Sequence, residues 1–358
     1  MSDMLRGTPL LRALSGGHAD WAAYAEWDVL IRQARDAALL GTLAHRVHES
    51  GSFDAVPPAP RAHLIAARIL CAAQRTSVER EIIQIRRALE GIGAKIVLLK
   101  GAAYLMADLP AAQGRHFSDV DILVPKSALP QVEAALMLAG FTTTHLHPYD
   151  QRYYRRFAHE LPPMQHVKRG TVLDVHHTIV PPTSRIRLDA SALLRDAVPL
   201  AQAPGFHVLA PADMVLHSAT HLFRNEDLTH GLRDLLDIDA LLRDFGRDAA
   251  FWPAIVRRAA ELDLRRPLHY ALRWTTAALA TPVPANVIAA NAEGAPGRIA
   301  GALMDVLLER ALHPDAGLPS TRRARWALYL RGHWLKMPLP LLAWHLTVKA
   351  MRREAQPA

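Results

Sequence analysis

The segment SDVDILVP at residues 118–125 constrains the fold most, because it places two carboxylates one residue apart in a run otherwise typical of a buried strand. Side chains alternate between the two faces of a strand, so Asp119 and Asp121 project together while Val120 and Ile122 face the core. Two ionised carboxylates at this spacing repel each other, and a divalent cation between them and a bound polyphosphate removes the repulsion. The segment therefore predicts a strand whose polar face holds a metal-dependent site.

A third carboxylate follows the same alternation in the segment TVLDVHH at residues 171–177. Asp174 and His176 share one face of this expected strand, and His177 points away from it. Asp174 then supplies an acidic ligand from a neighbouring strand, while His176 lines the cleft or orients a ligand. Three carboxylates from two strands suit two-metal phosphoryl or nucleotidyl transfer.

The first expected strand, AKIVLLK at residues 94–100, is followed by a glycine that opens a short helix. Backbone N–H groups at such a turn favour an anion, and the missing Cβ of Gly101 lets a phosphate approach. Lys100 and Arg115 add positive charge at the same place. These residues predict a phosphate-binding turn close to the acidic strand.

Hydrophobic periodicity divides the chain into three parts. We expect a helical N-terminal region at residues 1–90, an α/β core at 91–205 and a helical C-terminal region at 206–358. The core is expected to hold a mixed sheet of about five strands, which is within the usual size range. These strands lie at residues 94–100, 118–125, 141–147 and, as a hairpin turning at Arg169–Gly170, within 163–180. Ser127 is the expected N-cap and Gly140 the expected C-cap residue of the helix between them.

Three segments taken together, LLKG, RHFSDVDILV and LDVHH, resemble the DNA polymerase β-like nucleotidyltransferase superfamily. More narrowly, the chain resembles a bacterial family of uncharacterised nucleotidyltransferases that carry Leu-Lys-Gly before an Arg-x-x-x-Asp-x-Asp segment. The later segments PADMVLHSATHLF and LRDLLDIDALL are similar to the helical half of that family. The resemblance therefore spans roughly residues 20–270.

The resemblance implies an α+β fold, in which a polymerase β-like mixed sheet is flanked by helices, and a cytoplasmic enzyme that uses divalent metal. Asp119, Asp121 and Asp174 would hold Mg²⁺ or Mn²⁺, and Gly101 would border the triphosphate of an NTP, expected to be ATP. The implied reaction moves an NMP to a hydroxyl acceptor, with pyrophosphate leaving. The acceptor is a small molecule, a peptide, a protein or RNA, and the residues do not choose among these.

Ala102 departs from the wider superfamily, which usually has Gly-Ser at the turn. The missing hydroxyl removes one phosphate contact, and Lys100 is the candidate to replace it. An alternative function is therefore a non-catalytic nucleotide-binding or protein-binding module on the same fold.

A third alternative is a His/Asp metal phosphohydrolase. His217 and His221 lie four residues apart on an expected helix, which places them on one face, and Asp237 follows on the next helix. We favour a different interpretation, in which these residues form a polar seam that packs the helical region against the cleft. Arg233 would touch substrate from this seam.

The chain carries 42 Lys and Arg against 34 Asp and Glu, and the formal charge of +8 favours anionic partners. Residues 321–336 and 341–354 mix aromatic with basic side chains, which predicts either peripheral contact with a membrane or nucleic acid, or a packed helical hairpin. The single cysteine, Cys71, and the lack of a secretory signal at the N-terminus favour the cytoplasm. No apolar run is long enough for a transmembrane helix.

Overall fold

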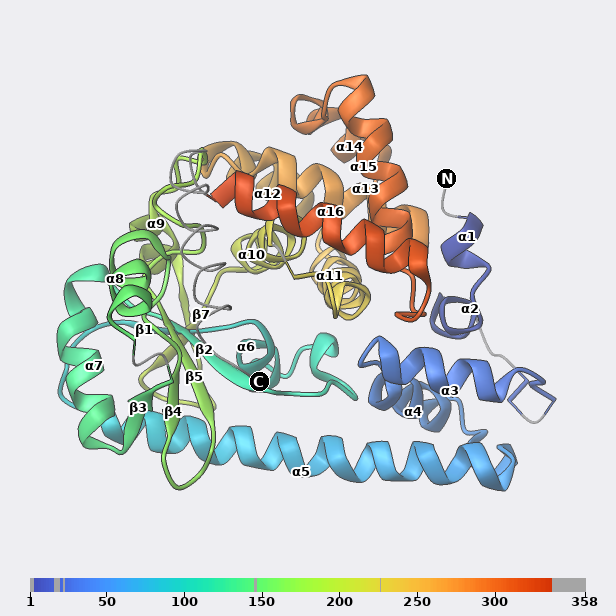
Figure 1. Cartoon of the computed structure of the whole chain (residues 1–358), viewed down its shortest axis with the longest axis horizontal. Coiled ribbons are helices and arrows are strands. Elements are labelled where there is room, and N and C mark those ends of the chain that lie inside the picture. The colour runs from blue at the N-terminus through green and yellow to red at the C-terminus, as the bar shows by residue number, and fades with distance from the viewer. Residues whose placement is uncertain (1–2, 16–19, 22, 145–146, 226, 337–358) are drawn as a thin grey trace.

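Figure 1 shows a mixed sheet at one end of the molecule, short helices at the other end, and helices from the second half of the chain lying above. The structure is a computed structural model that describes residues 3–15, 20–21, 23–144, 147–225 and 227–336. The long helix α5, Pro58–Ala88, runs from the N-terminal helices to the sheet. The predicted α+β architecture, with helices around a mixed sheet, is confirmed.

The N-terminal region is helical, as predicted. Its helices before α5 are α1 Asp3–Arg6, α2 Pro9–Ser15, α3 Trp27–Asp36 and α4 Leu40–Glu49. Between α3 and α4 the chain turns at Ala38, whose φ of 56° lies in the left-handed region. Helix α5 begins with Pro58 in its first turn, where the missing N–H of proline leaves no helical hydrogen bond unmade.

All five predicted strands are present, and two short strands were not predicted. The seven are β1 Ile96–Leu99, β2 Asp119–Leu123, β3 Phe141–Thr143, β4 Met164–His166, β5 Val172–His176, β6 Val198–Pro199 and β7 Phe206–Val208. Their order in the sheet is β3-β4-β5-β2-β1-β7-β6. The last two strands span two and three residues, which is too short for an alternating pattern to be read from the sequence.

The register of the central strands decides where the acidic residues meet. Strand β2 pairs in parallel with β5, and Asp121 lies opposite Asp174. Strand β1 pairs antiparallel with β2, and Leu99 lies opposite Asp121. Paired residues project to the same face of a sheet, so the end of β1 and the polar faces of β2 and β5 converge.

Helices connect the strands of the core. They are α6 Lys100–Met106, α7 Leu129–Leu138, α8 Pro148–Phe157 and α9 Ala190–Asp196. The prediction of Ser127 as N-cap of α7 is wrong, because a 3-10 turn over Lys126–Ala128 precedes the helix and Ala128 occupies the cap without a side-chain hydrogen bond. The predicted C-cap is wrong by one residue, since Ala139 is the C-cap and Gly140 follows it with a left-handed φ of 97°.

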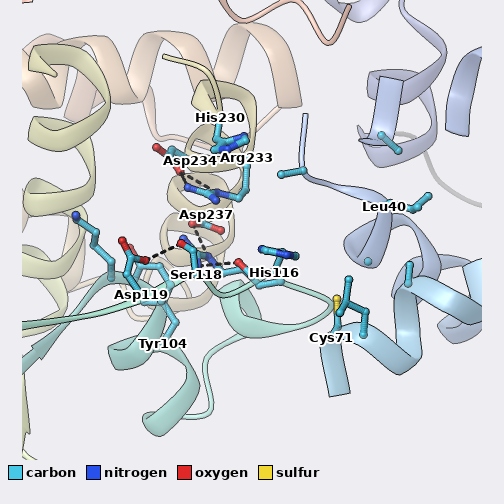
Figure 2. A pocket seen from close by; sticks show the side chains of 18 of the residues that line it. Leu40, Cys71, Tyr104, His116, Ser118, Asp119, His230, Arg233, Asp234 and Asp237 are labelled. Atoms are coloured by element: carbon cyan, nitrogen blue, oxygen red, sulfur yellow. Dashed lines mark hydrogen bonds and ion pairs between the residues drawn. The ribbon is translucent and has the colours of Figure 1, made fainter. Parts of the chain in front are cut away.

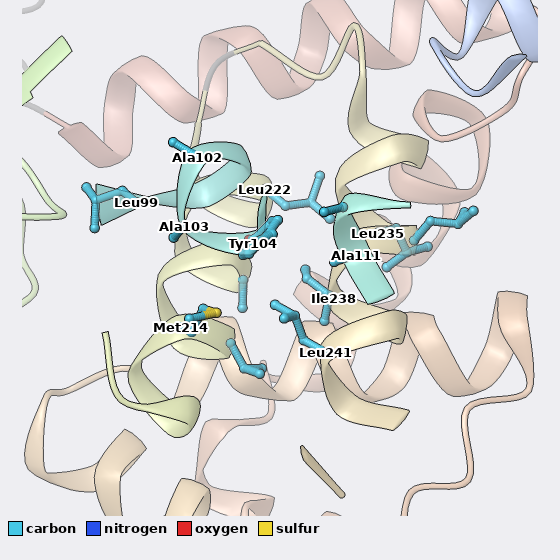
Figure 3. Packing of buried hydrophobic residues seen from close by; sticks show 14 of the residues in the cluster. Leu99, Ala102, Ala103, Tyr104, Ala111, Met214, Leu222, Leu235, Ile238 and Leu241 are labelled. Carbon is cyan, nitrogen blue, oxygen red and sulfur yellow. The ribbon is translucent and has the colours of Figure 1, made fainter. Parts of the chain in front are cut away.

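The second half of the described chain is helical, as predicted from its periodicity. Its α-helices are α10 Pro211–Arg224, α11 Gly231–Phe245, α12 Phe251–Glu261, α13 Arg265–Leu279, α14 Ala285–Ala290, α15 Arg298–Ala311 and α16 Pro319–Lys336. Figure 3 shows how α6 of the core meets α10 and α11 through buried side chains, which include Ala103, Tyr104, Met214, Leu222, Leu235 and Ile238. The Tyr104 hydroxyl also lies 2.6 Å from Ser218 Oγ of α10. Apolar burial and this hydrogen bond join the helical half to the core.

None of the helices in the described part of the chain has both the length and the apolar character needed to cross a membrane. The basic and aromatic residues 321–336 fall in α16, where Trp326 is 64% exposed and the Arg185 guanidinium lies 4.8 Å from the ring centre of Trp334. The second such segment, residues 341–354, lies outside the described residues.

A close backbone contact fixes the segment that leads into β2. A Cβ added to Gly114 would lie 2.4 Å from the carbonyl oxygen of Gly41 in α4, and the φ of Gly114 is 65°. Both the left-handed backbone and the lack of space require glycine here. This contact holds the loop that carries Arg115 and Asp119 against the N-terminal helices.

We expect Gly114→Ala to destabilise the protein by about 3 kcal/mol, because left-handed strain and a backbone clash add. Gly170→Ala is the matched control, since Gly170 has a similar φ of 72° but nothing lies near its added Cβ. The control should cost only about 1 kcal/mol. Urea unfolding of both variants measures the difference, and equal losses would show that the Gly41–Gly114 contact does not constrain the fold.

Candidate active site

Three carboxylates meet on the polar face of β2 and β5, as the alternation predicts. One oxygen from each of Asp119, Asp121 and Asp174 lies within 4.8 Å of the other two. Asp121 is buried, and the other two are half-buried. Ser118 donates a hydrogen bond of 2.8 Å to Asp119 Oδ1 at the entrance to β2. We call these three aspartates the carboxylate triad.

Asp121 is held as an anion by two neighbours. Lys100 Nζ lies 3.1 Å and His176 Nε2 lies 3.0 Å from the same oxygen, Asp121 Oδ1. Burial alone would raise the pKa of Asp121, but the charge of Lys100 and the hydrogen bond from His176 outweigh it and lower this pKa. Among the described residues, none is hydrogen-bonded to Asp121 Oδ2, so that atom keeps its capacity to bind a ligand.

Asp174 behaves differently although it lies beside Asp121. Burial, together with the negative charges of Asp121 and Glu160, raises the pKa of Asp174 to about 7. Its Oδ1 is buried and has no hydrogen-bond partner among the described residues. Such an orphaned carboxylate oxygen is costly, and a bound cation would both satisfy it and favour its ionised form. The all-oxygen donor set of the triad therefore fits Mg²⁺ or Mn²⁺.

Lys100 adopts a left-handed backbone, with φ of 45°, where β1 ends and α6 begins. This conformation costs a non-glycine residue about 1 kcal/mol and directs the Lys100 side chain to Asp121. Burial would lower the pKa of Lys100, but the charges of Asp121 and Asp119 outweigh it and raise this pKa. Lys100 therefore stays positively charged inside the site.

Gly101 lies against the side chain of Arg115. A Cβ on Gly101 would lie 2.5 Å from Arg115 Nη1, so the missing side chain makes room for this guanidinium. Arg115 donates from Nε to Asp237 Oδ2 of α11 at 3.0 Å, and its guanidinium lies 5.9 Å from the ring centre of Tyr104. The charge that the sequence assigned to the phosphate turn is thus paired with a carboxylate of the helical half.

A cavity of about 700 Å³ opens in front of the acidic strand. In Figure 2, Asp119 and Ser118 lie on one side of it, Leu40 and Cys71 lie on the opposite side, and Arg233 and His116 lie between. Lys100, Gly101 and Asp121 also line it. The cavity thus extends from Asp119 and Asp121 of the triad to the N-terminal helices α3, α4 and α5, and one molecule could span both ends.

The seam between α10 and α11 is polar, as predicted. His221 Nδ1 lies 3.7 Å from Asp234 Oδ2, and Arg233 Nη2 lies 2.8 Å from Asp234 Oδ1. His217 is buried, and burial with the nearby charge of Lys100 keeps its pKa well below the usual value. Asp237 pairs with Arg115 instead of the histidines. Among the described residues, His217, His221 and Asp237 do not form one metal-binding group.

A family described as uncharacterised nucleotidyltransferase matches residues 24–280, well over half of the chain. The chain belongs to this family. The matched region includes β1, β2 and β5 and the helices α10 and α11, so the cavity wall described above lies within the family region. No curated protein and no solved structure matches the chain.

Two residues next to the triad were not predicted from the sequence. Glu160 forms an isolated antiparallel bridge with His176, and its Oε2 lies 3.3 Å from His176 Nδ1. His159 lies beside them, with 5.3 Å between the ring centres of His159 and His176. A single bridge leaves no periodic pattern, and the only signal in the sequence is the pair of polar residues before the run LPP.

We expect Asp174→Asn to stabilise the metal-free protein at pH 8 by on the order of 2 kcal/mol, and to change little at pH 4. An unfolded Asp ionises near its ordinary pKa of 3.8, whereas folded Asp174 keeps its proton to about pH 7. The folded state holds more protons between these values, so wild-type stability falls as pH rises through this window and the variant does not share that loss. Urea unfolding in EDTA from pH 4 to 8 measures the difference.

Asp121→Asn is the matched control with the opposite sign. The folded pKa of Asp121 is lowered, so its stabilising effect is present above its unfolded pKa and is lost as the pH falls. This variant should therefore be less stable than wild type at pH 8. A pH-independent effect of Asp174→Asn would contradict the assignment of Asp174 as the carboxyl that keeps its proton.

Proposed function

We propose that this protein is a metal-dependent nucleotidyltransferase of the DNA polymerase β-like superfamily. It transfers an NMP from an NTP, with ATP as the expected donor, to a hydroxyl acceptor. The convergence of three carboxylate oxygens within 4.8 Å of one another carries the proposal, and the family match supports it. An NTP donor and a lone cysteine both agree with the cytoplasm as the place of reaction.

In this proposal the three carboxylates hold Mg²⁺ or Mn²⁺, which supplies Lewis-acid stabilisation of the phosphate charge. Asp121 is the permanent anion of the site, because Lys100 and His176 favour its ionised form. Asp174 is the candidate to assist deprotonation of the acceptor hydroxyl, because a carboxyl whose pKa is raised to about 7 is suited to exchange a proton near neutral pH. The different environments of two neighbouring carboxylates thus give them different tasks.

We assign the triphosphate to the turn that contains Lys100 and Gly101. The side chain of Ala102 is only 1% exposed and lies in the hydrophobic core, so it offers nothing to a phosphate. Lys100 keeps its charge next to the triad and is the proposed substitute for the hydroxyl of the wider superfamily. Arg115 also lies beside Gly101, but its ion pair with Asp237 offsets its positive charge there.

We assign the acceptor to the far end of the cavity. This end is lined by small and apolar residues of α3 and α5, among them Ala34, Ala66 and Leu70. Arg35 lines it too, and its Nη2 lies 2.8 Å from His63 Nδ1. The acceptor would therefore present an apolar part to α5 and a polar part to Arg35 or to the seam.

We expect Asp121→Asn to reduce pyrophosphate release by about 10³-fold or more, because the loss of a charged metal ligand removes several kcal/mol of stabilisation. Asp305→Asn is the matched control, since Asp305 pairs with Arg273 away from the cavity. NTP labelled on its α-phosphate, Mg²⁺ and fractionated small molecules, peptides, proteins and RNA provide the assay, and label transfer identifies the acceptor fraction. Nucleotide binding with no transfer in any fraction would support a non-catalytic module instead.

We expect Ala66→Trp to weaken transfer to the acceptor by about 10-fold, because the indole would fill the end of the cavity assigned to it. Binding of a fluorescent NTP analogue should stay unchanged. Ile83→Trp is the control on the same helix, since Ile83 is 43% exposed and lies outside this cavity. Equal effects of the two variants on transfer would contradict the assignment of the acceptor to this end of the cavity.

A further inference from the structure

A second group of potential metal ligands lies on the other side of His176 from the carboxylate triad. His176 Nε2 contacts Asp121, and His176 Nδ1 lies 3.3 Å from Glu160 Oε2. The same Glu160 oxygen lies 3.7 Å from His159 Nε2. One ligand atom from each of His159, Glu160 and His176 lies within 4.8 Å of the others. We call these residues the His₂Glu cluster.

The backbone holds the cluster in place before any ligand binds. Glu160 and His176 form an antiparallel bridge, and the Leu161 N–H donates to the carbonyl of Val175 at 2.9 Å. The His177 N–H donates to the carbonyl of His159, also at 2.9 Å. These two hydrogen bonds, one on each side of the bridge, therefore attach the segment 159–161 to β5. A site built this way loses little conformational entropy when an ion binds.

His176 supplies the independent sign of a missing ligand. The residue is only 3% exposed, and its Nδ1 is buried without a hydrogen-bond partner among the described residues. The distance to Glu160 Oε2 is short, yet the two atoms are not aligned as donor and acceptor. A buried nitrogen that faces a carboxylate and a second imidazole without a hydrogen bond is suited to donate its lone pair to a cation.

The donor atoms indicate which cation. Two imidazole nitrogens and one carboxylate form a borderline set that suits Zn²⁺, whereas the triad offers oxygen alone and suits Mg²⁺. A zinc-bound histidine usually gives its other ring N–H to a carboxylate, and His176 has Asp121 in that position. The side chains of His159 and Glu160 are 21% and 19% exposed, so the ion has a path to the cluster and water can complete its coordination.

We propose that His159, Glu160 and His176 form a Zn²⁺ site, and that Zn²⁺ on His176 Nδ1 keeps the proton on Nε2 and so orients Asp121. The binding site stands on the cluster alone, and only its effect on catalysis rests on the proposed function. The imidazole of His176 would then connect two metal sites of different chemistry, since it would bind Zn²⁺ through Nδ1 and contact Asp121 of the triad through Nε2. His176 acts as a positioning residue, because it reaches the triad through Asp121.

The test uses the full chain, freed of metal with a chelator and then titrated with Zn²⁺ in excess Mg²⁺, which occupies the oxygen triad. Isothermal titration calorimetry should show one equivalent of Zn²⁺. Glu160→Gln and His159→Gln should each weaken Zn²⁺ binding by at least about 100-fold, since loss of an outer partner alone costs 10–100-fold. Asp119→Asn should leave Zn²⁺ binding unchanged, because Asp119 belongs only to the triad.

X-ray absorption at the zinc edge gives a second readout, with two imidazole ligands expected in wild type and one in His159→Gln. Circular dichroism shows whether each variant folds. If one of the two cluster variants does not fold, the other is enough to test the site. Three results would overturn the site: no Zn²⁺ binding in excess Mg²⁺, binding that survives both cluster variants, or binding lost in Asp119→Asn. The first would leave His176 hydrogen-bonded to Asp121 and close to Glu160 without a metal.

The outcome is separable from that of the proposed function. Zinc bound by the cluster in a protein that transfers no nucleotide would confirm the site and remove the proposed activity. If transfer is found, Glu160→Gln should lower its rate by about 10-fold in the presence of Zn²⁺ and shift its pH profile, while the apparent affinity for NTP stays constant. A rate and profile equal to those of wild type would refute the positioning of Asp121 through His176.

Discussion

The parallel pairing of β2 with β5 is the constraint on which the rest of the site depends. Opposite residues of a parallel pair project to the same face, so the register that sets Asp121 against Asp174 forces two carboxylates together. Uncompensated charges in such a partly buried place are costly. The fold compensates only one of the two carboxylates. Lys100 and His176 both contact Asp121, whereas Asp174 Oδ1 has no hydrogen-bond partner among the described residues.

This asymmetry links stability to function. Asp121 is ionised and gives the site a fixed negative charge, because its partners Lys100 at the start of α6 and His176 at the end of β5 favour the carboxylate. Asp174 is the carboxyl that holds its proton more strongly, since burial and the charge of Asp121 raise its pKa to about 7. A protein selected for stability alone would replace such a carboxyl with a neutral residue. Its presence therefore points to a ligand that favours the ionised form, as a divalent cation does.

The triad could be predicted from the sequence because strand alternation is a local pattern. It shows to which face of each strand the three aspartates project. The register between β2 and β5 is not local, and alternation indicates only which faces are involved. Glu160 and His159 were missed, since one bridge to His176 creates no periodicity. Helical spacing placed Asp237 on the seam, but its partner Arg115 lies 122 residues away and no local pattern reports that contact.

The ion pair of Arg115 with Asp237 makes the helical half part of the site. Both side chains are only 10% exposed, so breaking the pair would leave a buried charge unmatched. Arg115 stands four residues before Asp119, and the loop between them is also fixed by the contact of Gly114 with Gly41. The position at which β2 begins is therefore set by α4 on one side and α11 on the other. Because the first carboxylate of the triad follows this loop, the strand register alone does not determine the site, and the flanking helices must pack correctly before the three oxygens converge.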